Sequence, residues 1–337
     1  SSSGFLSHDG LSAELVKLLV SFWFASGTYP HDAPVDNRPC PQSARPTVET
    51  RGGHMDEIVC ANTAFRYWRC PPQVHDLYPR LPSSDDGWRA LSQAPFVTDV
   101  LKTPIIAVAS PGCCNHHSGL RSTIRWEGAS DTGTTTDTHL GFSVTNPLNT
   151  LFTMTRFVSP IDLVLAMYEL CGWFSVFEPT PAVEMQLKIA LKENRNSSTQ
   201  DLFELGEGED EIPWKRVYAR TTVKVPVNEG QTNNREDGRE VTKLKGTSLW
   251  MRKPLIELSD LHRFAEKVKS QMWGKQFYDA AQQVIGIAAS PLEVAGVLLL
   301  SRSRRLGGSG FRYVYLNDLT PLSEEAQSIA GQKVCYG

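Results

Sequence analysis

The sequence lacks a dominant charge of either sign, and this limits what composition alone says about function. Its 337 residues hold 34 Lys and Arg against 37 Asp and Glu, a formal net charge of −3. The composition therefore gives no whole-molecule basic field that would attract nucleic acid, and any such contact must be local. The apolar fraction of 40% is ordinary for a soluble protein, and the length suffices for two or three domains with cores of their own.

A paired cysteine framework and a long hydrophobic run are also missing. The seven cysteines are odd in number and have no repeated spacing, which argues against disulfides and for reduced thiols in a cytoplasm. The segment that most resembles a membrane or export signal, Leu15–Ala25, is too short to span a bilayer and has no basic head. We therefore predict a cytoplasmic protein with no membrane partner.

Residues 1–54 show no sustained periodicity beyond that short run, which predicts a disordered leader or linker. Two interpretations of Arg51–His54 stay open. These residues are either an ordinary polar linker or the translation of a ribosome-binding sequence, in which case the natural protein starts at Met55. Because the chain begins at Ser1 and ends just after an apparent strand onset at Lys333–Tyr336, we expect a fragment of a longer protein.

The most strongly patterned segment, residues 290–310, predicts a complete helix. Ser290 is a good N-cap, Pro291 suits the first turn, and Glu293 holds the third position, where a capping box places its carboxylate. Residues 292–300 are apolar on nearly every side, so we expect this helix to be buried. Three arginines then stand at the negative end of the helix dipole, before two glycines that end it: Arg302, Arg304 and Arg305, then Gly307 and Gly308.

A second segment begins with the same pattern. Ser159–Asp162 leads into an apolar helix that Gly172 is expected to end. Since capping alone accounts for an acid at this position, Glu293 considered by itself needs no catalytic explanation.

A short helix is expected over Thr63–Cys70, with Asn62 as its cap. Its Arg66 and Arg69, interleaved with aromatic residues, are suited to contact nucleic acid, although such rings more often pack in a core. Further helices are expected from Ser259 or Asp260 and over Phe277–Ile285.

Several segments predict strands: Pro104–Ala109, Arg121–Trp126, Leu140–Val144, Phe311–Leu316 and Val334–Tyr336. Between the first two, Cys113–His117 contains four soft metal ligands in five residues. Adjacent ligands do not converge well on one tetrahedral ion, so an exposed loop is favoured over a zinc site.

A long hairpin is predicted from Val217–Val227 and Val241–Met251, after an acidic, solvated loop at Glu204–Glu211. Six basic residues belong to it: Lys215, Arg216, Arg220, Lys224, Lys243 and Lys245. Two interpretations remain open, a DNA-touching arm and edge strands that carry lysine to block aggregation; the second is the commoner use of such residues.

These elements predict an α+β fold of mixed helices and short sheets. We expect four parts: a leader at 1–54, an α+β domain at 55–175, an inserted basic hairpin and acidic loop at 176–253, and a further domain at 254–337.

Short motifs occur along most of Met55–Gly337 in a characteristic order: Ala64–Arg69, Ser159-Pro160, Tyr168–Gly172, Ser290–Glu293, Arg305–Gly310 and Leu316-Asn317. In these motifs the chain resembles a family of uncharacterised bacterial proteins that join an AbiEi-antitoxin-like N-terminal part to an endonuclease-like domain. That domain belongs to the PD-(D/E)XK superfamily, close to the very-short-patch-repair type. The resemblance implies that the antitoxin-like part is residues 55–175 and that 254–337 is the first helix and strand of the restriction-endonuclease-like core.

The resemblance also implies a chemistry. In PD-(D/E)XK enzymes a helical acid, a strand Asp and a Glu-x-Lys-like strand converge on Mg²⁺, which activates water for attack on a phosphodiester. By position Glu293 is the helical acid, and its partners would follow Gly337, so the chain is expected to bind no metal and to be inactive as given. Mg²⁺ is expected only for an intact nuclease.

The leading hypothesis is therefore a DNA-interacting, nuclease-like defence or repair protein. The alternative is a non-catalytic, antitoxin-like regulator that binds DNA or a partner protein. The candidate DNA contacts are basic residues at the end of the Ser290 helix and in the hairpin: Arg302, Arg304, Arg305, Lys215, Arg216 and Lys224.

Overall fold

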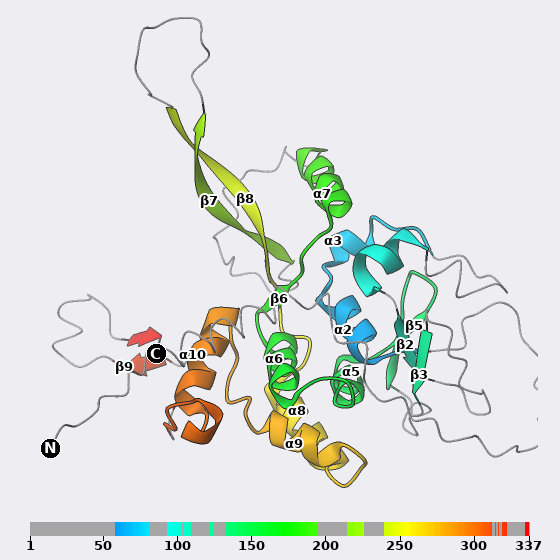
Figure 1. Ribbon diagram of the computed structural model, residues 1–337, viewed down its shortest axis with the longest axis vertical. Coiled ribbons are helices and arrows are strands. Elements are labelled where there is room, and N and C mark those ends of the chain that lie inside the picture. The colour runs from blue at the N-terminus through cyan, green and yellow to red at the C-terminus, as the bar shows by residue number, and fades with distance from the viewer. Residues whose placement is uncertain are drawn as a thin grey trace, which may run out of the picture.

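The computed structural model describes residues 58–80, 93–102, 104–108, 121–124, 133–193, 214–225, 239–311, 314, 316, 319–321 and 334–336. The expected leader at 1–54, the Cys113–His117 turn and the Glu204–Glu211 loop lie outside these residues. Within them, helices alternate with small mixed and antiparallel sheets, and the predicted α+β class is confirmed (Figure 1).

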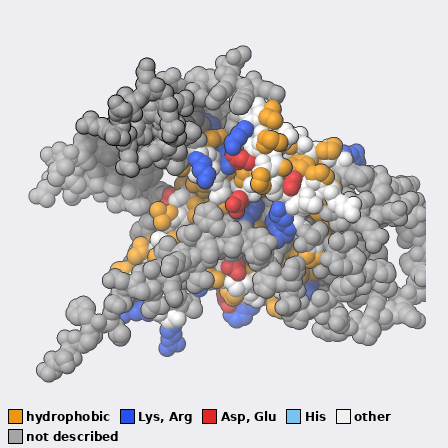
Figure 2. Space-filling view, turned by 45° about the horizontal axis from the view of Figure 1, so that its top comes forward, with side chains coloured by type: hydrophobic (Ala, Val, Ile, Leu, Met, Phe, Trp, Pro, Cys, Tyr) orange, Lys and Arg blue, Asp and Glu red, His pale blue; other side chains and the backbone are white. Residues whose placement is uncertain are grey.

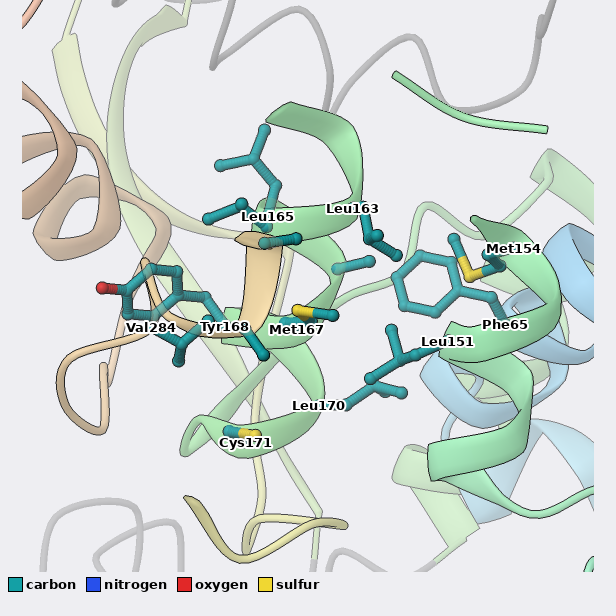
Figure 3. Packing of buried hydrophobic residues seen from close by; sticks show 14 of the residues in the cluster. Phe65, Leu151, Met154, Leu163, Leu165, Met167, Tyr168, Leu170, Cys171 and Val284 are labelled. Carbon is teal, nitrogen blue, oxygen red and sulfur yellow. The ribbon is translucent and has the colours of Figure 1, made fainter. Parts of the chain in front are cut away.

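The central helix is α6 (Pro160–Cys171), in which every residue from Leu163 to Cys171 is buried. Figure 3 shows its two sides: Leu163 and Leu170 face Phe65 and Leu151, whereas Tyr168 lies on the other side beside Val284. Packing on both sides explains why the sequence of this helix is apolar all round.

Both ends of α6 match the sequence prediction. The Ser159 hydroxyl accepts a hydrogen bond from the Asp162 backbone N–H at 3.3 Å, and Gly172 is the C-cap. The glycine is not left-handed, because its φ is −91°. It is needed for space instead, since a Cβ there would lie 2.6 Å from the Tyr168 carbonyl oxygen and 2.7 Å from that of Ala288.

A five-stranded mixed sheet lies on the α2 and α5 side of α6, with strand order β3-β2-β1-β5-β4. Its strands are β1 (Ile58–Val59), β2 (Ile105–Val108), β3 (Arg121–Ile124), β4 (Thr135–Asp137) and β5 (Ser143–Thr145). The pairs β1–β5 and β2–β3 are parallel, and β1–β2 and β4–β5 are antiparallel. Strands β2 and β3 confirm two of the predicted strands, whereas the third begins at Ser143 and not at Leu140.

Three helices and one π-helical turn occur in the same part of the structure as this sheet (Figure 1). They are α2 (Ala61–Arg69), α3 (Pro72–His75), α5 (Pro147–Met154) and the turn Val97–Leu101. The prediction that Asn62 caps α2 is wrong. Cys60 is the N-cap and Asn62 is buried inside the first turn, because β1 runs directly into the helix through Ala61, at φ +50°. The hydroxyl of Thr153 in α5 accepts from the Ala61 N–H at 3.0 Å and so replaces a local cap.

The predicted hairpin is confirmed as β7 (Lys215–Val225) and β8 (Arg239–Met251), which pair antiparallel. Only the last residues of β8 also pair with β6 (Phe174–Val176), so the three-stranded sheet exists at the base alone. Figure 1 shows β7 and β8 projecting away from the body beyond this point, with α7 (Pro181–Glu193) near their base. We call the two strands from Tyr218 to Val225 and from Arg239 to Gly246 the arm.

Three helices follow the arm: α8 (Leu258–Val268), α9 (Gly274–Ala281) and α10 (Pro291–Ser301). Their buried residues share one hydrophobic cluster with those of α2, α5 and α6, so the cluster takes members from both sides of residue 254. Phe277 of α9, for example, packs edge-on to Phe152 of α5 with ring centroids 5.6 Å apart. The boundaries of the four expected parts stay a prediction.

The expectation that α10 is buried on nearly every side is wrong. Val294, Ala295, Val297 and Leu298 are buried, but Leu292 is 76% and Leu300 43% exposed. In the described part of the chain, α10 contributes one side to the α6 cluster, whereas α6 has neighbours on both sides.

The last described elements are the single turn of 3₁₀ helix Arg304–Leu306 and the strands β9 (Leu319–Pro321) and β10 (Val334–Tyr336), which pair antiparallel. The predicted strand at 334–336 is confirmed, and β9 is a strand that the sequence did not predict. The strand expected at Phe311–Leu316 falls partly outside the described residues. No helix in the described ranges has the length and apolar character that crossing a membrane requires.

Candidate nucleic-acid interface

Glu293, the candidate metal-site acid, is held as a helix cap. One carboxylate oxygen accepts the Ser290 hydroxyl at 3.1 Å and the other accepts the Ala289 N–H at 2.8 Å. The Ser290 hydroxyl oxygen in turn accepts the Glu293 N–H at 3.3 Å. This reciprocal pair is the capping box that the sequence predicts.

Both carboxylate oxygens of Glu293 accept protein hydrogen bonds, as a helix cap requires. Among the residues that the structure describes, no group of three or more His, Cys, Asp or Glu is placed to hold a metal ion.

The three arginines after α10 differ in their surroundings. Arg302 is the C-cap, and partial burial lowers the pKa of its guanidinium. Arg304 and Arg305 are exposed in the following 3₁₀ turn, which Gly307 ends at φ +82°. Of the three arginines, these two are exposed, whereas Arg302 is partly buried.

Arg216 fixes the base of the arm to α7. Its guanidinium donates to Glu184 of α7 at 2.7 Å and to the Thr247 carbonyl at 2.7 Å, and it lies over the Trp250 ring at 5.7 Å. Its side chain is only 8% exposed. A Cβ at Gly246 would come within 2.5 Å of the Arg216 guanidinium carbon, so glycine leaves room for this anchor. These contacts describe a structural arginine at the base of the arm.

Lys215 and Lys224 lie at opposite ends of β7 and do not meet. Lys215 pairs with Met251 at the base, and Lys224 pairs with Glu240 near the far end. The six candidate contacts are therefore distributed over two regions, the end of α10 and the hairpin, and within the hairpin over the two ends of β7.

The register of the arm shows a pattern that the sequence predictions missed. Successive residues of a strand lie on alternate faces, and directly paired residues share a face. The pairs Ala219–Lys245, Thr221–Lys243, Val223–Val241 and Val225–Arg239 therefore share one face, which we call the β8-basic face. The other face holds Tyr218–Gly246, Arg220–Leu244, Thr222–Thr242 and Lys224–Glu240. Arg239 was absent from the predicted basic set because the predicted second strand begins at Val241; the even spacing from Arg239 through Lys243 to Lys245 was the signal.

Arg69, a second basic residue considered for nucleic-acid contact, belongs to the core. Its guanidinium forms two hydrogen bonds of 3.0 Å with the carboxylate of Glu169 in α6, which is fully buried. Glu169 also accepts from the Ser175 hydroxyl at 3.0 Å and the Val176 N–H at 2.9 Å. Arg69 is therefore a core residue, and the expectation that the rings of this helix pack in a core is confirmed by buried Phe65 and Tyr67.

A third buried charge joins this network from the base of β8. Arg252 is 1% exposed, and its guanidinium donates to the Glu169 carbonyl at 2.6 Å. Burial lowers the pKa of Arg252 to about 10, while the Glu169 charge acts in the opposite direction. Arg252 therefore stays cationic at neutral pH, and the network links α2, α6, β6 and the residue after β8.

His75 is also a core residue. It stacks on Tyr67 at 4.5 Å, and burial, with His139 as a second cause, lowers its pKa to about 4. A buried imidazole that is neutral at pH 7 suits packing and not a phosphate contact.

On the face shown in Figure 2, basic and acidic side chains of the described residues are interspersed, in line with the balanced composition. Comparison with known family models, curated proteins and solved structures finds no match for this chain. The resemblance to AbiEi-like and PD-(D/E)XK proteins therefore stays a prediction.

Proposed function

We propose that this chain is a DNA-interacting protein whose contact with DNA is made by the arm. The observation that carries the proposal is the charge of a ribbon that projects from the body: β7 and β8 contain seven Lys or Arg and one acid, Glu240. In a chain of net charge −3, this is the local basic element that a nucleic-acid contact requires.

The base of the arm is fixed to the rest of the structure, which favours a role in holding the two strands out toward DNA. Arg216 joins it to α7, and Trp250, opposite Arg216 in the register, is buried. A two-stranded β-ribbon is one of the elements that the major groove of DNA admits.

Of the two functional hypotheses, the contacts of Glu293 favour the non-catalytic one. A carboxylate held by Ser290 and the Ala289 N–H is accounted for by capping, so nuclease activity rests on the resemblance alone. We therefore place a DNA-binding regulator first and a nuclease-like defence or repair protein second.

The test is salt-dependent binding of a fluorescent 20-base-pair duplex to the whole chain and to a shortened-arm variant. In this variant, residues 220–244 are replaced by Asn-Gly, which suits a two-residue hairpin loop between the paired Ala219 and Lys245. Three phosphate contacts predict roughly a 40-fold loss of affinity between 50 and 200 mM salt for the whole chain. The shortened variant should bind at least about tenfold more weakly at 50 mM salt.

Equal binding by the two chains, or none by the whole chain at 50 mM salt, would reject the proposal and leave edge protection as the role of these lysines. Circular dichroism checks that the shortened variant is folded. Mg²⁺-dependent cleavage that Glu293→Gln abolishes would instead place the nuclease hypothesis first.

A further inference from the structure

The two faces of the arm differ in the number of basic and acidic residues that they carry. Among the eight positions of the β8-basic face, three are basic and none is acidic. The other face carries Arg220 and Lys224, and Lys224 is paired directly with Glu240. By residue type, that face holds two basic positions and one acidic position, a formal charge of +1 against +3 for the β8-basic face.

All three basic residues of the β8-basic face stand on one strand. Lys243 and Lys245 are two residues apart, about 6.8 Å along the strand, and Arg239 lies four residues before Lys243. The β7 positions opposite them are Ala219, Thr221 and Val225. The basic residues therefore form a line along β8, about 20 Å long, beside an uncharged row.

Resting on the proposed function, we infer that the β8-basic face is the DNA-binding face and that β8 lies along one phosphate backbone of a duplex. A ribbon set fully into the major groove would meet a backbone on each side and would need basic residues on both strands. Here only one strand supplies them, so the arm follows a single backbone.

The same face indicates a duplex and not a single strand. Binding of single strands uses aromatic side chains on which bases stack. None of the eight positions is aromatic, and the one aromatic residue of the arm, Tyr218, belongs to the other face. A row of Ala, Thr and Val also offers no long polar side chain for base edges, so binding is expected to be independent of sequence.

Two double variants with the same change in net charge test the assignment. Lys243→Gln with Lys245→Gln neutralises the β8-basic face, and Arg220→Gln with Lys224→Gln is the matched control on the other face. Both leave the residues between β7 and β8 and the Arg216 anchor intact. Each is measured against the duplex, a second duplex of different sequence and a single strand of equal length, over a salt series.

We expect the Lys243/Lys245 variant to lose about tenfold or more in duplex affinity, with a salt slope smaller by about 1.8, which is two phosphate contacts. The Arg220/Lys224 variant should stay within about twofold of the unchanged chain. Arg239→Gln provides a second, single substitution on the β8-basic face and should reduce the slope by about 0.9.

The outcomes separate this inference from the proposed function. Equal losses in the two double variants would overturn the choice of face while leaving binding by the arm intact. No loss in either, together with full binding by the shortened arm, would overturn the proposed function itself. Single-strand binding as tight as duplex binding, or a strong preference between the two duplexes, would overturn the single-backbone geometry.

Discussion

At the scale of single residues, burial decides which charged side chains are structural. Arg69, Glu169 and Arg252 are almost completely removed from solvent, yet their charged groups are matched by hydrogen bonds from four segments of the chain. Taking an ion out of water costs several kcal/mol, and a network of this kind is stable only while its members remain paired.

Glu169→Gln is predicted to destabilise the protein by about 3–5 kcal/mol, because it leaves the Arg69 guanidinium buried without a counter-charge. Urea denaturation at pH 7 measures the change. Asp279→Asn is the matched control, since it breaks the exposed Lys275–Asp279 pair of 2.9 Å and should cost under about 0.5 kcal/mol. Similar costs for the two substitutions would show that the buried pair is not maintained in solution.

At the scale of elements, the same start signal serves two helices with different surroundings. Ser159 and Ser290 each accept a hydrogen bond from the backbone N–H three residues later, at 3.3 Å in both cases. Yet α6 is buried on both sides, whereas α10 leaves Leu292 and Leu300 exposed. The cap is set by local sequence, and burial is set by what packs against the helix.

Ser290→Ala and Ser159→Ala are predicted to cost similar amounts, about 1 kcal/mol each, because each removes one N-cap hydrogen bond. Glu293→Gln should cost less, since an amide oxygen can still accept one of the two bonds at the head of α10. Thermal and urea unfolding of the three variants tests this. A clear gain in stability for Glu293→Gln would contradict a purely capping role, because replacing a functional acid commonly stabilises a protein.

At the scale of the whole molecule, one hydrophobic cluster joins helices from before and after the arm. Phe152 of α5 packs edge-on against Phe264 of α8 and Phe277 of α9, with centroids 6.1 and 5.6 Å apart. The described residues within 58–176 and 256–298 therefore share a core, and we expect them to unfold together.

Phe277→Ala is predicted to lower global stability by about 3–5 kcal/mol, because it leaves a cavity among buried rings. Hydrogen exchange should show the loss equally in α5, α6 and α9, if these helices open as one cooperative unit. Met272→Ala, at a side chain 75% exposed, is the control and should change exchange little. A loss confined to α8–α10 would instead support a separate domain beginning near residue 254.

Local chemistry allowed the sequence to predict the caps of α6 and α10, the glycine that ends α6, the hairpin and the α+β class. Each depends on hydrogen bonds or side-chain alternation within a few residues. The start of α2 was missed because its cap comes from Thr153, 92 residues away. In the candidate site, the alternation of residues along β8 is readable in the sequence. The pairing of Lys224 with Glu240 is not, because it depends on the register between two strands.

Tertiary structure alone decided which helix is central and which arginines are paired with a carboxylate. Arg69 meets Glu169 across 100 residues, and Arg216 meets Glu184 across 32, so no local pattern distinguishes them from free basic residues. The apolar runs of α6 and α10 look alike as sequence, but among the described residues α6 has neighbours on both sides and α10 on one. Burial depends on elements brought together by folding, and a single segment does not carry that information.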